Sequence, residues 1–80
     1  MMTNQQKFDL AFTEVFNVAK QELKDLQYKL TPAWDSITSI QLIMSLEHAF
    51  GITVEREDYQ FMTSYQGVSK TLCDKYKVRL

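Results

Sequence analysis

The sequence is poor in several residue types that mark particular kinds of protein. Its 80 residues include one cysteine, one proline, two glycines and one histidine. Cys73 has no second cysteine for a disulfide and no suitably spaced histidine for a structural zinc site, so we predict neither a disulfide nor a metal. The scarcity of glycine and proline argues against a disordered or loop-rich chain.

Long apolar runs and an excess of one charge are also missing. No apolar stretch approaches the roughly 20 residues needed to span a bilayer, so we predict no membrane association. The N-terminus lacks the basic and then apolar pattern of a secretory signal, and the expected location is therefore cytoplasmic. Nine basic against ten acidic residues give a net charge of −1 without a basic stripe, which argues against nucleic-acid binding.

Hydrophobic spacing predicts an all-α fold in one domain that covers residues 1–80. The composition, 45% hydrophobic and 24% charged, is that of a globular protein. Apolar residues recur at helical spacing from Phe8 to Leu26. This recurrence predicts a first helix of roughly 20 to 25 residues that begins near Thr3 and has Asp9 on its polar face.

Three more helical segments are expected after a loop at Pro32. A helix over residues 36–50 is delimited by Gly51, which fits the left-handed position after a helix end. Residues 55–62 indicate a short helix or helical turn, and a last helix should begin at residue 63 or 64. The sequence therefore predicts a small four-helix bundle with a short third helix.

Charged residues and the cysteine in the last third of the chain are expected to play no chemical role. We interpret Cys73 as a small buried hydrophobic residue. One group of charged residues is interpreted as a solvated cluster: Glu55, Arg56, Glu57 and Asp58. A second group is interpreted as cations in the last turn of the final helix: Lys75, Lys77 and Arg79.

The start of the helix at residues 36–50 is the most distinctive site. Asp35 has the chemistry of an N-cap, which makes Ser36 the first helical residue. The first N–H groups of a helix lack partners and the peptide dipoles leave partial positive charge there, so an anion is favoured at this position. The dipole alone would stabilise a phosphodiester on Ser36 by roughly 0.3 to 1 kcal/mol.

The residues around this serine form a longer pattern. The chain reads Asp35-Ser36-Ile37, then an aliphatic helix, then Leu46-Glu47 and Phe50-Gly51-Ile52. This pattern resembles the modification site and second helix of the acyl carrier protein family. The resemblance implies an all-α four-helix bundle of acyl-carrier type with a short third helix, and it implies 4′-phosphopantetheine on Ser36, beside Asp35, whose thiol holds acyl groups as thioesters.

The resemblance also implies partners and the residues that meet them. The partners would be a phosphopantetheinyl transferase and acyl-loading and acyl-processing enzymes, and the carrier is expected to be a monomer. The partner-binding residues would be Trp34, Ile37, Ile40, Met44 and Glu47, and the acyl cavity would be lined by Leu46, Tyr59, Phe61 and Met62. The residues alone leave other readings open, namely Trp34 as a lid on the core and Ile40, Met44 and the cavity residues as internal packing.

No catalytic residues are predicted, so the chain is expected to be no enzyme. His48 lies twelve residues beyond Ser36 on the same helix, and three helical turns rule out a hydrogen bond between them. The sequence has no glycine-rich phosphate loop, HExxH motif or nucleophile elbow. Chemistry would have to come from partner enzymes.

The low charge of the helix at residues 36–50 helps to distinguish between kinds of acyl carrier. After Asp35 its only carboxylate is Glu47, whereas carriers of fatty-acid synthesis are generally strongly acidic there. Weak electrostatic steering favours dedicated partners and a specialised pathway such as polyketide biosynthesis. The alternatives are a carrier of primary fatty-acid biosynthesis and, from another class, an unmodified helical protein-protein adaptor.

Overall fold

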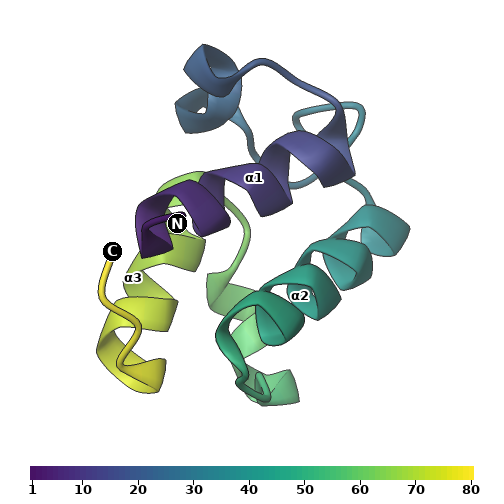
Figure 1. The fold of residues 1–80 in the computed structure, drawn as a ribbon. Helices are drawn as coiled ribbons and strands as arrows, with labels where there is room; N and C mark the ends of the chain where they lie inside the picture. Colours follow the sequence, from purple (N-terminus) through teal and green to yellow (C-terminus); the bar gives the residue numbers. More distant parts are fainter.

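The computed structural model describes residues 1–80 and is helical, without strands. Three α-helices and two 3-10 helices follow one another along the chain. Figure 1 shows α1 above α2 and α3, with the two termini close together. The all-α prediction is confirmed for this mostly helical globule, whose elements are α1 (Asn4–Phe16), η1 (Lys20–Asp25), α2 (Ser36–Phe50), η2 (Arg56–Phe61) and α3 (Tyr65–Tyr76).

Helix α1 begins as expected and ends much earlier. Thr3 and Gln6 form a capping box at its start. The helix stops at Phe16 because Asn17 adopts a left-handed conformation, φ 54°, and donates its N–H to Thr13 O at 2.9 Å. The predicted length of roughly 20 to 25 residues is therefore wrong, since asparagine tolerates this conformation and closes the helix after 13 residues.

The apolar residues beyond Asn17 are nevertheless buried. Leu23, in η1, and Leu26, just after it, are 2% and 4% exposed. The helical spacing therefore predicts correctly that these two residues are buried. They reach the core through a 3-10 helix, however, and not through a continuation of α1.

Asp9 differs from its expected place on a polar face. It is buried, and Oδ1 accepts hydrogen bonds from Tyr65 Oη and from Gln5 Nε2. Burial and the bond to Asp9 raise the pKa of Tyr65 to about 12. The buried carboxylate therefore joins α1 to α3 through the Tyr65 hydroxyl.

The core is built around aromatic side chains. Phe8 and Phe12 from α1 are fully buried, and Phe12 and Phe16 lie 5.9 Å and 4.8 Å from Trp34 between ring centroids. Trp34 is itself 1% exposed, and its Nε1–H donates to Ser39 Oγ at 2.8 Å. The reading of Trp34 as a lid on the core is confirmed, and its indole is covered in this structure.

Helix α3 begins one residue after its cap, Ser64, whose hydroxyl accepts from Gly67 N–H at 3.0 Å. A Cβ on Gly67 would lie 2.6 Å from the backbone oxygen of Phe61. This close approach of η2 explains a glycine in the first turn of the helix. Cys73 is only half-buried, so its interpretation as a buried residue is wrong.

Asp58 departs from the predicted solvated cluster. It is buried, and Lys75 Nζ and Tyr76 Oη both donate to its carboxylate. Tyr76 Oη also accepts from Glu55 N–H at 2.7 Å. The short helix η2 is therefore fastened to α3 by an ion pair and hydrogen bonds. No helix in the structure has the length and apolarity needed to cross a membrane.

Candidate functional site

Ser36 is the first residue of α2, and the residue before it caps the helix. Asp35 Oδ1 accepts the backbone N–H groups of Ile37 and Thr38, each at 3.0 Å. These bonds, chiefly that from Thr38, lower the pKa of the Asp35 carboxyl below its ordinary value. The N-cap prediction is confirmed, and Ser36 stands exposed at the positive end of the helix dipole.

Thr38 completes a capping box that fixes the entry to α2. Its Oγ1 accepts the N–H of Asp35 at 2.8 Å and donates to the carbonyl of Ala33 at 2.7 Å. Hydrogen bonds therefore fix the backbone on both sides of Ser36. The other end of α2 is also as predicted, because Gly51 is left-handed, φ 63°, and Ile52 N–H donates to Glu47 O at 3.1 Å.

The Ser36 hydroxyl has one side-chain partner, Tyr28. The phenolic oxygen of Tyr28 lies 3.1 Å from Ser36 Oγ. His48 stands twelve residues along α2, a rise of about 18 Å, so no imidazole approaches this serine. The arrangement presents a hydroxyl without a general base, which suits an acceptor of a group more than an activated nucleophile.

A cleft of about 300 Å³ opens beside Ser36, between α2 and the segment that contains η2. Two of the four predicted cavity residues, Tyr59 and Met62, line it. Of the other two, Leu46 is completely buried in the core and Phe61 borders a separate hollow with α3. The complete lining is Tyr28, Ser36, Ser39, Ile40, Ile43, Tyr59, Gln60, Met62 and Thr63.

Sequence reasoning did not find Tyr28, Ser39, Ile43, Gln60 and Thr63 as lining residues. Ile43 carried a signal, since it lies three residues after Ile40 on the same helix. The placement of Tyr28 depends on a pairing between distant loops, which no local pattern in the sequence records.

An edge of exposed aliphatic side chains runs along α2 from the serine. Ile37, Ile40 and Met44 are 68%, 55% and 61% exposed. The reading of Ile40 and Met44 as internal packing is therefore wrong, because both side chains face solvent. Glu47, the acidic residue expected at the partner surface, is half-buried, and its Oε2 accepts Val54 N–H at 2.8 Å.

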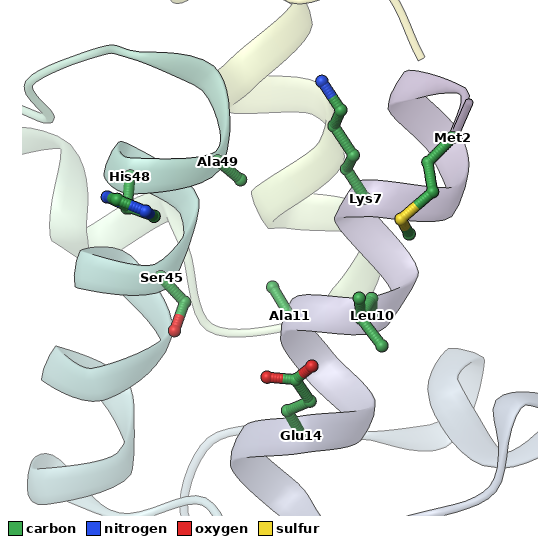
Figure 2. A pocket seen from close by; sticks show the side chains of 8 residues that line it. All are labelled: Met2, Lys7, Leu10, Ala11, Glu14, Ser45, His48 and Ala49. Carbon is green, nitrogen blue, oxygen red and sulfur yellow. The ribbon is translucent and has the colours of Figure 1, made fainter.

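A second groove of about 430 Å³ lies between α1 and the far half of α2. Figure 2 shows Ser45 and Ala49 of α2 facing α1 across it, with Glu14 extending from the opposite side. His48 also lines the groove, but its ring stays beside α2, and no hydrogen bond joins it to Ser45 or Glu14. The groove thus holds a serine, a histidine and a carboxylate that are not connected for proton transfer.

The chain was compared with known protein families, curated proteins and solved structures. No protein-family model, curated protein or solved structure matches the chain.

The structure also holds no group of three or more histidine, cysteine, aspartate or glutamate side chains that could bind a metal ion.

Proposed function

We propose that the protein is an acyl carrier that holds acyl groups as thioesters on a 4′-phosphopantetheine arm attached to Ser36. The observation that carries this proposal is the position of one exposed hydroxyl at the capped start of α2, beside an apolar-lined cleft. The same hydroxyl begins the edge of exposed aliphatic side chains on α2.

Each part of the arm has a matching feature near Ser36. The phosphodiester would lie at the N-terminus of α2, where the helix dipole favours an anion. An acyl chain at the far end of a folded-back arm would meet Ile40, Ile43 and Met62 in the cleft. The arm can alternatively extend into solvent because Ser36 is itself exposed.

In this proposal the helices correspond to those of a four-helix bundle of acyl-carrier type. Helices α1, α2 and α3 would be its three long members and η2 its short third helix, with η1 inside the first long connection. The early end of α1 is compatible with this correspondence because the residues of η1 still contribute to the core.

The modification is a group transfer that needs coenzyme A and a phosphopantetheinyl transferase. Ser36 Oγ attacks the phosphorus that bears the pantetheine arm, and an oxygen–phosphorus bond forms. The pyrophosphate bond to the adenosine bisphosphate breaks, and that group leaves with the bonding electrons. The serine proton passes to a base of the transferase, since the side chain bonded to Ser36 Oγ is the Tyr28 hydroxyl and the Asp35 carboxylate is engaged as the helix cap.

The exposed edge formed by Ile37, Ile40 and Met44 is the proposed contact for the transferase and for acyl-loading and acyl-processing enzymes. Since α2 carries little charge, recognition would depend on short-range packing, with weak salt dependence. This chemistry favours a carrier of polyketide or other specialised-metabolite biosynthesis over one of primary fatty-acid synthesis, and a monomer would suffice for it.

A second candidate is an unmodified helical adaptor, which the same exposed aliphatic edge favours. Covalent modification separates the two functions. A carrier gains one phosphopantetheinyl group from coenzyme A, magnesium and a promiscuous transferase, whereas the Ser36→Ala variant gains none. An adaptor gains nothing in either form, and its binding to a partner survives Ser36→Ala.

A further inference from the structure

We propose that Tyr28 is a positioning residue for Ser36, an inference that rests on the proposed function. The two hydroxyl oxygens lie 3.1 Å apart, and either can donate. Ser36 belongs to α2, while Tyr28 lies eight residues earlier in the loop after η1. The fold therefore creates this contact, and it is the one side-chain hydrogen bond made by the serine oxygen.

The backbone of Tyr28 is held from two sides. Its N–H donates to Thr63 O at 2.8 Å, next to a β-bridge between Gln27 and Ser64. The following residue, Lys29, donates its N–H to Trp34 O at 3.0 Å, and Trp34 is anchored in the core. Tyr28 itself is half-buried and packs against that core. Its hydroxyl is therefore presented by a fixed scaffold.

A fixed partner matters because an exposed serine distributes its side chain over three staggered rotamers. The bond to Tyr28 Oη selects the rotamer that holds Ser36 Oγ beside the cleft. Group transfer requires the attacking oxygen to lie in line with the phosphorus and its leaving group. Preselecting one rotamer raises the fraction of bound chains in which that alignment is met.

The kinetic test uses the full chain as the substrate of a promiscuous phosphopantetheinyl transferase with coenzyme A. Tyr28→Phe keeps the ring and removes only the hydroxyl. We expect kcat for modification to fall by about 3- to 10-fold, from the rotamer population and the lost hydrogen bond. KM for the chain should stay unchanged, because the exposed edge of Ile37, Ile40 and Met44 remains intact.

Tyr65→Phe is the matched control. It also removes one hydrogen-bonded tyrosine hydroxyl, which donates to Asp9, but Tyr65 lies outside the cleft and does not bond to Ser36, so its folded variant should be modified at the rate of the unaltered chain. A general effect of losing a tyrosine hydroxyl would slow both variants. Thermal unfolding of each variant shows that the rates are compared between folded chains.

A second measurement is independent of the transferase. Three-bond couplings between Hα and the two Hβ protons of Ser36 report its side-chain rotamer by NMR. The unaltered chain should give the couplings of a single rotamer, and Tyr28→Phe should give averaged values. The couplings of the unaltered chain alone show whether Ser36 occupies a single rotamer, so the positioning role can be tested even if Tyr28→Phe does not fold.

The outcomes separate this inference from the function on which it rests. If the unaltered chain is modified at Ser36 while Tyr28→Phe matches it in kcat, the carrier function stands and the positioning role is overturned. A rise in KM at constant kcat, or averaged Ser36 couplings in the unaltered chain, overturns the role equally. If active transferases never modify the folded chain, the carrier function itself fails and the role is lost with it.

Discussion

The Lys75 ammonium lies 2.9 Å from Oδ1 and 2.8 Å from Oδ2 of Asp58, a carboxylate that is only 4% exposed. Tyr76 Oη donates to the same carboxylate. These bonds fasten η2 to α3, and η2 forms one wall of the cleft beside Ser36. The shape of the candidate acyl site therefore depends on an ion pair whose two residues do not line the cleft.

This ion pair predicts a loss of stability in acid. The hydrogen bonds from Lys75 and Tyr76 hold the pKa of Asp58 below its ordinary value of 3.8. The unfolded chain consequently takes up this proton first as the pH falls. The contribution of Asp58 to stability is fully present above about pH 4 and is lost as the pH falls through its lowered pKa. Urea unfolding between pH 2 and pH 6 measures this loss.

Asp58→Asn should lower stability at neutral pH and flatten this acid dependence, because the titrating group is gone. Glu57→Gln is the control, since Glu57 is an exposed neighbour on η2 with no ion pair. It should leave both the stability and its pH dependence near those of the unaltered chain. An Asp58→Asn variant with the full acid dependence would show that other carboxylates dominate it.

We expect the substitution Gly67→Ala to have an unusual effect on the free energy of unfolding. In an open helix, Gly→Ala stabilises by roughly 1 kcal/mol. Here the new Cβ would lie 2.6 Å from Phe61 O, so we expect Gly67→Ala to destabilise by about 1 to 3 kcal/mol in denaturant unfolding. The exposed neighbour Gln66, changed to alanine, should stay within about 0.5 kcal/mol. Stabilisation by Gly67→Ala would contradict the close approach of η2 to α3.

Two isoleucines on α2 should respond in opposite ways. Ile43 is 5% exposed, and Ile43→Ala should cost about 2 to 5 kcal/mol of unfolding free energy. Ile40 is 55% exposed, so Ile40→Ala should change stability by less than about 0.5 kcal/mol. Instead it should raise KM for modification by a transferase, since the proposed contact surface is reduced. Equal destabilisation by both variants would contradict the exposed edge of α2.

Much of this fold follows from local patterns in the sequence. The limits of α2 were predictable because Asp35 and Gly51 each have the chemistry of a helix end. The end of α1 was not, because apolar spacing continues past Asn17 and only the backbone reveals the left-handed turn there. The prediction of a solvated Asp58 is wrong for a related reason, since the partners of its carboxylate lie 17 and 18 residues away on another helix.

The residues of the candidate site also differ in whether the sequence could predict them. Ser36 and its cap could be located from the sequence because both depend on neighbouring residues on one helix. Tyr28 could not, because its approach to Ser36 depends on a loop that pairs with residues 63 and 64. Phe61 and Met62 are adjacent in the sequence, yet only Met62 lines the cleft. Phe61 is the last residue of η2 and borders the hollow beside α3, whereas Met62 follows the helix and lines the cleft.

The intact mass of the chain shows whether Ser36 accepts the phosphopantetheine arm. The purified chain is incubated with coenzyme A, magnesium and a promiscuous phosphopantetheinyl transferase, beside Ser36→Ala and the control Ser45→Ala, which alters the distant second groove. We predict a gain of one phosphopantetheinyl group in the unaltered chain and in Ser45→Ala, and none in Ser36→Ala. A folded chain that gains nothing from several active transferases, or a gain that persists in Ser36→Ala, would show that Ser36 does not carry the arm.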